Sequence, residues 1–294
     1  METLPKSLGD YKNDAHNWIT LISGEYYPDT LTHACELYKP VLVLFGQLLS
    51  QSESSKIFFL NIAAFKEQWM RIQLSRVFRK YVSPETPVEM LKKKTQAQII
   101  VDRFGEGFRA INVVQAKYNS RPIPDEAICA ILWEYKDRGK KGYDLTEKMF
   151  LLLKDVHPEL TIIGPERAGR DILMKEVFSD YPNPDRPIDF VIKKQDHILA
   201  IGLARYDGDR GGAQEDDRIG GYMNCANEFA TYARQYGLST KIIFINDGPG
   251  LLLGTMWNDY TKLEASWKRR IMVATLRMVQ ERITPEWLYS EVEK

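Results

Sequence analysis

The sequence has few of the residue types on which many enzymes depend. Among its 294 residues are only four histidines, and none has a partner at the spacing of a metal or triad motif. Its three cysteines, Cys35, Cys129 and Cys225, lie far apart in the chain. They have no zinc-ligand spacing, so we expect small buried thiols in a reducing compartment. A site built on histidine or cysteine chemistry is therefore disfavoured.

Several motifs of cofactor-binding and hydrolytic folds are also missing. The chain has no Gly-x-Gly-x-x-Gly after a strand, no Gly-x-x-x-x-Gly-Lys-Ser/Thr, no Gly-x-Ser-x-Gly and no His-Glu-x-x-His. These motifs carry dinucleotide binding, nucleotide-phosphate binding, acyl transfer and zinc-dependent proteolysis, respectively. The sequence therefore gives no support to any of these four function classes.

Long apolar runs and an excess of one charge are absent too. The longest apolar stretch, residues 40–49, is too short to span a bilayer, and the first residues do not have the pattern of a signal peptide. We expect a cytoplasmic protein with no membrane partner. Forty basic and forty acidic residues give a net charge of zero, so any nucleic-acid site must come from a local group of side chains.

Hydrophobic periodicity divides the chain into two parts. Residues 1–140 have helical spacing and little that is typical of sheet. A helix is expected at 125–137, and residues 86–89 have the pattern of a capped helix start. The basic segment 138–142 indicates an exposed linker. We expect an N-terminal helical region at 1–140 and an α/β core at 141–294.

The second part alternates helical and strand patterns, which is typical of a layered α/β fold. The expected strands are 160–163, 188–192, 198–203 and 242–245, with 251–255 as a further candidate. The expected helices are 145–156, 222–236, 263–279 and 286–292. The second and third strands are separated by a polar turn and should form a hairpin.

An acidic residue interrupts the first strand of that hairpin. Asp189 is followed directly by Phe-Val-Ile, and burial of a carboxylate there is costly unless it binds a ligand or takes part in chemistry. One or two carboxylates with waters can hold Mg²⁺, which can activate a water and stabilise a phosphorane-like transition state. The other interpretation is a structural acid that caps a turn or pairs with Arg186.

A dense group of charged and amide side chains follows the second strand. It consists of Arg205, Asp207, Asp209, Arg210, Gln214 and Arg218. In the major groove arginine can read guanine, glutamine adenine and aspartate cytosine. The alternating signs favour arginines that carboxylates hold at fixed angles, which suits base readout better than plain phosphate binding. The other interpretation is an internal salt-bridge network on a loop.

The order of these elements resembles the restriction-endonuclease-like, or PD-(D/E)XK, nuclease superfamily. Pro187-Ile188-Asp189 is similar to the family's Pro-Asp element with one residue inserted, and residues 201–207 fall where the family has its Glu-x-Lys strand. The arginine-rich, glycine-containing turn that follows resembles type II restriction enzymes. The similarity extends over residues 145–250, approximately the α/β core.

The resemblance implies a mixed central sheet flanked by helices, and a type II site-specific deoxyribonuclease. Such a protein is a homodimer that binds palindromic double-stranded DNA and hydrolyses phosphodiesters with Mg²⁺ as cofactor. Asp189 would hold the metal with Glu166 or Asp171, and Lys193 could supply the lysine. The group from Arg205 to Arg218 would contact bases. The N-terminal helical region would serve in dimerisation or DNA clamping.

The chain departs from the family pattern on the strand after Asp189. The family's Glu and Lys align with Gly202 and Ala204, which can neither ligate a metal nor hold a water. One interpretation is a catalytically inactive nuclease-fold DNA-binding protein or specificity subunit. Another is a shift of one residue in strand register, which would turn Leu203 and Arg205 to the site and give Arg205 the role of the lysine.

A third interpretation is that the acid and base have moved to other positions. The available groups are Glu166, Asp171, Glu215, Asp216, Lys193 and Lys194. Outside the family, the charged turn could be the interface of a protein-interaction domain that binds no nucleic acid.

Overall fold

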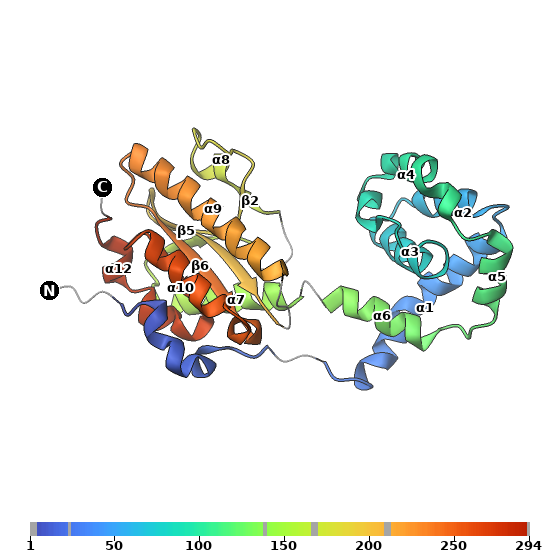
Figure 1. Cartoon of the computed structure of the whole chain (residues 1–294), viewed down its shortest axis with the longest axis horizontal. Helices are drawn as coiled ribbons and strands as arrows, with labels where there is room; N and C mark the ends of the chain where they lie inside the picture. Colours follow the sequence, from blue (N-terminus) through green and yellow to red (C-terminus); the bar gives the residue numbers. More distant parts are fainter. Residues whose placement is uncertain (1–4, 23–24, 138–139, 166–169, 209–212, 293–294) are drawn as a thin grey trace. The chain divides into compact units, whose positions relative to one another are not determined.

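The computed structural model describes residues 5–22, 25–137, 140–165, 170–208 and 213–292, with the backbone alone for 137, 140–143 and 213–217 (Figure 1). The chain divides into two compact units. Gly24–Arg138 forms the helical unit, and Met1–Ser23 together with Gly139–Lys294 forms the α/β unit. The start of the chain therefore groups with the α/β unit, whereas the sequence pattern had placed all of 1–140 in one helical region.

The helical unit is built from helices joined by short turns. They are α1 (Asp29–Ser50), α2 (Ser55–Ala63), α3 (Gln68–Tyr81), α4 (Ala97–Phe104), α5 (Ile111–Asn119) and α6 (Glu126–Asp137). Aromatic side chains fill the core, including Phe45, Phe58 and Phe78, which are fully buried. The helix expected at 125–137 is confirmed by α6. Among the described residues of the chain, no helix is long and apolar enough to cross a bilayer.

The capped helix expected from 86–89 is wrong. The segment is a 3₁₀ turn, Val88–Lys92, and the buried hydroxyl of Thr86 has no hydrogen-bond partner among the described residues. The buried side chain of Arg71 explains the short element. Its Nε donates to the Leu91 carbonyl at 2.7 Å, and its guanidinium also donates to the Lys92 carbonyl at 3.1 Å. Those carbonyls are then bonded to α3 instead of to a following helical turn.

The α/β unit contains a five-stranded mixed sheet of order β1-β4-β5-β6-β7. The strands are β1 (Thr161–Ile163), β4 (Phe190–Lys194), β5 (His197–Tyr206), β6 (Lys241–Asp247) and β7 (Ile271–Ala274). Strand β4 is antiparallel to both β1 and β5, and β6 and β7 run parallel to β5. A small second sheet joins β2 (Ile172–Leu173) to β3 (Pro187–Ile188). The expected mixed α/β sheet and its hairpin are confirmed.

Two long helices cover opposite faces of this sheet (Figure 1). Phe150 of α7 (Lys140–Val156) packs edge-on against Phe190 of β4. Tyr222 of α9 (Ala213–Gln235) packs against Phe244 of β6, 4.7 Å between ring centroids. The strand register places Phe190 and Phe244 on different faces, because neighbouring strand residues alternate in direction. Helix α9 also makes the crossover from β5 to β6, as parallel strands require.

Two expectations near the C-terminus are wrong, and a third is confirmed only in part. Residues 263–279 are not one helix, because α10 (Met256–Ser266) ends and Ile271–Ala274 becomes β7. All four residues of β7 are buried between layers, where a continuous apolar run suits a parallel strand better than an amphipathic helix. The candidate strand 251–255 begins instead as part of the 3₁₀ turn Pro249–Leu252. Of the helix expected at 286–292, only α12 (Pro285–Tyr289) forms.

The start of the chain is fixed to the α/β unit by buried acids. The 3₁₀ segment Leu8–Trp18 lies against α10, and Glu264 of α10 accepts the Leu8 N–H at 2.8 Å and both hydrogen bonds from one Arg282 nitrogen. Asp247, which is fully buried, accepts the Thr20 N–H at 2.7 Å. Hydrogen bonds from backbone N–H groups therefore explain why the carboxylate of Asp247 can be buried at the end of β6.

Candidate functional site

Asp189 lies at a break in the strand between β3 and β4. Its N–H donates to the Gly202 carbonyl at 2.9 Å, and its Oδ2 accepts the Ala204 N–H at 2.7 Å. A side-chain oxygen thus replaces the usual backbone partner of Ala204 and draws the carboxylate toward the C-terminal part of β5. Burial raises the pKa of the Asp189 carboxyl, and the hydrogen bond from Ala204 opposes that shift. The group is partly buried, with one oxygen left for another ligand.

A second carboxylate lies beside Asp189. Strands β2 and β3 pair Ile172 with Ile188 and Leu173 with Pro187, so the same register places Asp171 opposite Asp189. The negative charge of Asp171 further raises the pKa of Asp189, which agrees with this proximity. Asp171 is exposed. Of the two candidates for the second acid, the structure brings this one to Asp189; Glu166 lies outside the described residues.

Arg205 is on the same face of the sheet as Asp189. Phe190 points to α7, so the residue before it points to α9, and Leu203 and Arg205 share that direction on β5. The positive charge of Arg205 lowers the pKa of Asp189. Gly202 and Ala204 face the other way. In the observed strand register, Arg205 faces the side of the sheet on which Asp189 lies, and Ala204 faces the opposite side.

The structure does not bring Lys193 to this group. Lys193 is four positions further along β4, about 13 Å from Asp189 at the rise of a strand. It pairs with Thr161 and Ile198 next to the hairpin turn. Its neighbour Lys194 lies over the ring of Tyr289. No lysine from this end of β4 can share a small ligand with Asp189.

Asp207 connects two of the arginines predicted to read bases. Its side chain is buried, and its Oδ1 accepts a hydrogen bond from Arg218 of α9 and lies 3.5 Å from Arg205 Nε. Burial raises the pKa of Asp207, and Arg218 and then Arg205 oppose this. The Arg205 side chain is still 43% exposed, so it can meet a ligand while Asp207 fixes its direction.

The backbone around Asp207 is equally constrained. Its N–H donates to the Asp247 carbonyl at 2.7 Å, and its carbonyl accepts the Gly250 N–H at 2.9 Å. Gly248, with φ +108°, allows this turn to pass against Asp207. Of the other predicted base-reading residues, Asp209 and Arg210 lie outside the described residues. For Gln214, and likewise for Glu215 and Asp216, the backbone alone is described, within α9.

Three polar residues at this end of the sheet, Tyr222, Asn246 and Tyr260, are not predicted from the sequence as part of the site. The hydroxyl of Tyr222 on α9 donates to Asn246 Oδ1 at 3.4 Å, and Tyr260 of α10 lies beside Tyr222, 6.1 Å between ring centroids. Among the described residues, Asn246 Nδ2, Tyr260 Oη and Asp207 Oδ2 are buried without a hydrogen-bond partner. Buried polar atoms normally have a hydrogen-bond partner, so a water or a ligand is expected to bind these three atoms. The sequence pattern of residues 246–250 indicates a turn and gives no sign of this cluster.

The carboxylates suit a hard cation. Mg²⁺ binds oxygen ligands and commonly takes one or two carboxylates, with waters and substrate oxygens completing its shell. Asp189 and Asp171 are two such groups on neighbouring strands. Across the described ranges, no three or more His, Cys, Asp or Glu residues gather as a candidate metal site. These residues do not supply a complete set of protein ligands for a metal ion. They allow a site with two carboxylate ligands, in which substrate and water oxygens would complete the coordination.

No protein-family model, no curated protein and no solved structure matches this chain. The functional argument therefore rests on the chain's own residues and their geometry.

Proposed function

We propose that this protein is a Mg²⁺-dependent endonuclease of the restriction-endonuclease-like fold that cuts double-stranded DNA at a specific sequence. The observation that carries the proposal is the grouping of Asp189, Asp171 and Arg205 near the C-terminal end of β5. The order α7, β1, β4, β5, α9, β6 supports it, because it is the order that the family resemblance implies. The two carboxylates would bind a cation, and Arg205 would bind a phosphate.

Each of these residues would have a distinct part in phosphodiester hydrolysis. Asp189 and Asp171 would hold Mg²⁺, which when bound supplies a Lewis acid and lowers the pKa of a water. Arg205 would place a fixed positive charge beside the developing negative charge on the phosphate. Asp207 would hold Arg205 and Arg218 in position. Arg205 would thus take the part of the family's lysine as an electrostatic group, without acting as a base.

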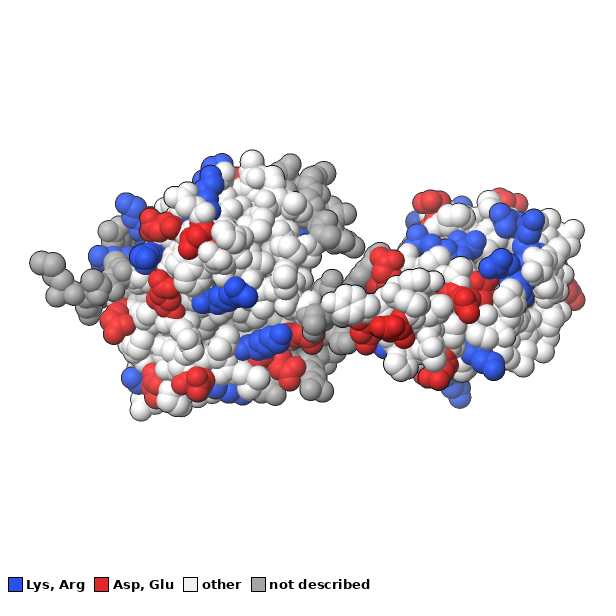
Figure 2. Space-filling view, turned by 90° about the horizontal axis from the view of Figure 1, so that it is seen from below, with Lys and Arg blue, Asp and Glu red and all other residues white. Residues whose placement is uncertain are grey.

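Recognition of DNA would depend on local contacts. Figure 2 shows acidic and basic side chains interspersed over the visible face of the α/β unit, without a broad basic field. Steering by the overall charge is therefore weak, and specificity would come from Arg205, Arg218 and the segment that contains Asp209 and Arg210. A homodimer would present two such segments to a palindromic site.

A DNA-binding protein without catalysis is the second candidate. The absence of a carboxylate and a lysine at 202 and 204 favours it, because Gly202 and Ala204 cannot serve a metal. Plasmid cleavage with Mg²⁺, together with gel-shift binding in Ca²⁺, separates the candidates. Cleavage at a fixed sequence supports the endonuclease, and specific binding without cleavage supports the inactive DNA-binding protein. If the protein neither cleaves nor binds DNA, a protein-interaction domain is the remaining candidate.

A further inference from the structure

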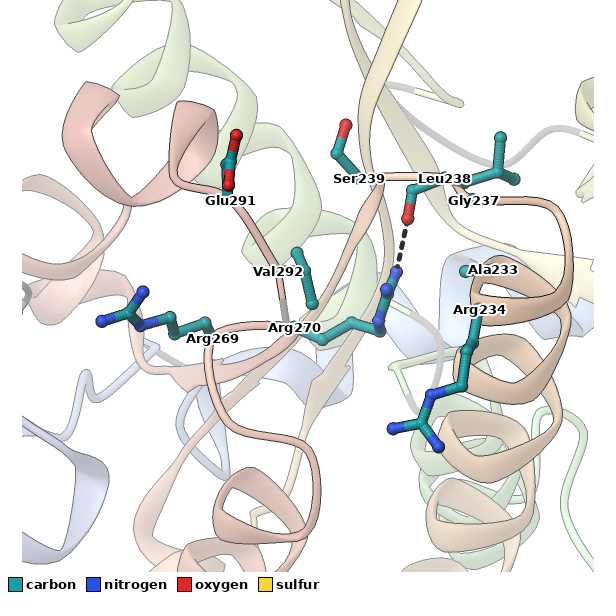
Figure 3. A pocket seen from close by; sticks show the side chains of 9 residues that line it. All are labelled: Ala233, Arg234, Gly237, Leu238, Ser239, Arg269, Arg270, Glu291 and Val292. Carbon is teal, nitrogen blue, oxygen red and sulfur yellow. Dashed lines mark hydrogen bonds between the residues drawn. The ribbon is translucent and has the colours of Figure 1, made fainter. Parts of the chain in front are cut away.

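A cavity lies at the end of the parallel strands that is opposite to Asp189 and Arg205. Its volume is about 340 Å³, and it is lined by the loop before β6, the turn before β7 and the end of α9 (Figure 3). Asp189, Arg205 and Asp207 lie where β5 ends, whereas this cavity lies where β6 and β7 begin. Six residues of strand separate these ends by about 20 Å. The cavity is therefore a separate site.

Three arginines line this cavity: Arg234, Arg269 and Arg270. Arg270 is only 3% exposed, and one of its nitrogens donates to the Leu238 carbonyl at 3.0 Å (Figure 3). The same nitrogen donates to the Thr240 carbonyl at 2.9 Å. Within the described part of the chain, no carboxylate forms an ion pair with any of the three arginines. Burial lowers the pKa of Arg270, and the charge of Arg234 lowers it further. Buried charges are normally paired, and among the described residues the buried Arg270 has no anionic partner, whereas Arg234 and Arg269 are exposed.

Among the described residues, the surroundings of the cavity carry more positive than negative charge. Lys241 is fully buried at the start of β6 and does not line the cavity; its Nζ donates to the Ser290 carbonyl at 2.7 Å. Burial and then the charges of Arg270 and Arg269 lower the pKa of the Lys241 ammonium group. Of the described residues that line the cavity, Glu291 is the one acid; it is exposed, and its carboxylate points away from Arg270 in Figure 3.

The shape of the cavity is held by its own backbone and by an aromatic residue. Arg269 has φ +63°, a conformation that is uncommon for a residue with a side chain and that recurs at binding sites. The guanidinium of Arg234 lies 4.8 Å from the Trp267 ring centroid, which orients it at the rim. The Ser239 side chain supplies a hydroxyl on the cavity wall.

We propose that this cavity binds the phosphate group of a phosphomonoester of nucleotide size. Guanidinium groups recognise phosphate through paired, charge-assisted hydrogen bonds, and two or more of them suit a dianion. The volume falls in the range of small-molecule pockets and is far below what a duplex requires. Bound phosphate would neutralise Arg270 and relieve the repulsion among the three arginines of the cavity lining. This site does not depend on whether the acids at Asp189 cleave DNA.

The test is isothermal titration calorimetry of the full chain at low ionic strength. The titrants are inorganic phosphate, a nucleoside 5′-monophosphate, its uncharged nucleoside, and a short single-stranded oligonucleotide with and without a 5′-phosphate. The variants are Arg234→Gln and Arg269→Gly, since glycine accepts the backbone at 269 without strain. Arg103→Gln, an exposed arginine of the helical unit, is the control. Circular dichroism establishes that each variant is folded.

We expect the monophosphate to bind and the nucleoside not to bind. Each cavity variant should weaken binding by about ten-fold or more, as the loss of a charged hydrogen bond predicts, and Arg103→Gln should leave it unchanged. Tighter binding of the 5′-phosphorylated oligonucleotide would identify a nucleic-acid end as the source of the phosphate. Absence of binding by every phosphate compound, or equal binding by wild type and cavity variants, would overturn the proposal.

Discussion

The phenyl ring of Phe190 lies over Gly202 on the neighbouring strand. The two residues are a register pair of β4 and β5, and a Cβ at position 202 would overlap the ring. The ring packs in turn against Phe150 of α7. Glycine at 202 is therefore a requirement of packing, and the position where the family's glutamate was expected is filled from the opposite strand.

The variant Gly202→Ala should lower the free energy of unfolding by about 1–3 kcal/mol, because the added methyl group overpacks the contact with Phe190. Urea unfolding followed by circular dichroism measures the change. In the double variant Gly202→Ala/Phe190→Leu, the loss should be smaller than the sum of the single losses. Additive losses would show that the two side chains do not compete for the same space.

Removal of the Asp207 carboxylate should be strongly destabilising. The Asp207 side chain is 1% exposed and that of Arg218 11%, so Asp207→Asn leaves a largely buried guanidinium without a negatively charged partner. We expect a loss of about 3–5 kcal/mol, which is typical of a broken buried ion pair. Asp259→Asn is the matched control because its partner Lys262 is exposed, and a loss of about 0–1 kcal/mol is expected there. Similar losses in both variants would contradict the assigned role of Asp207.

The stability of the protein should depend on the protonation of Lys241. Burial, together with the charges of Arg270 and Arg269, lowers the pKa of its ammonium group to about 8. Between this value and the ordinary lysine pKa of about 10.4, the unfolded chain binds the additional proton. The contribution of Lys241 to the free energy of unfolding therefore rises with pH across that interval.

The variant Lys241→Met isolates this effect. The difference in unfolding free energy, wild type minus Lys241→Met, should increase from about pH 8 to about pH 10 and stay nearly constant below about pH 7. Urea unfolding of both proteins in a series of buffers measures it. A difference that falls with pH would mean that the ammonium group is stabilised where it is buried.

Arg205 should act in cleavage through its positive charge. In a plasmid cleavage assay, Arg205→Ala should lower the rate by about 100-fold or more, as expected for loss of a group that stabilises the transition state. Arg205→Lys should recover part of that loss, because it keeps the charge without the planar fork. Arg277→Ala, on the 3₁₀ turn after β7, serves as the exposed control. Equal rates for Arg205→Ala and Arg205→Lys would exclude the charge as the reason.

The sequence predicts the parts of this fold whose patterns are local. The hairpin around Asp189, the buried strand β6 and the crossover helix α9 follow from apolar periodicity and turn residues. Strand β7 was missed because a short buried strand and a buried helical segment have the same apolar composition. The turn at Val88–Lys92 was missed because Arg71, distant in sequence, takes the carbonyls that a helix would use.

The candidate site was predictable only in part, for a similar reason. Asp189 and the charged residues after β5 stand out because charge follows a core strand. The choice of Asp171 depends on the pairing of β2 with β3, and the choice of Arg205 depends on which face Phe190 takes. Tyr222, Asn246 and Tyr260 are ordinary residues in the sequence. Among the described residues, Asn246 Nδ2 and Tyr260 Oη are buried without a hydrogen-bond partner, which becomes evident only where α9, β6 and α10 meet.

The central claim is that Asp189 holds the metal of a DNA-cleaving site, and one cleavage assay tests it most directly. Wild type, Asp189→Ala and Asp196→Ala, an exposed acid of the hairpin turn, are compared on plasmid DNA in Mg²⁺, with specific DNA binding followed in Ca²⁺. We expect fixed-site cleavage by wild type and Asp196→Ala, and its loss in Asp189→Ala while the protein stays folded. Cleavage by Asp189→Ala at the wild-type rate would contradict the account.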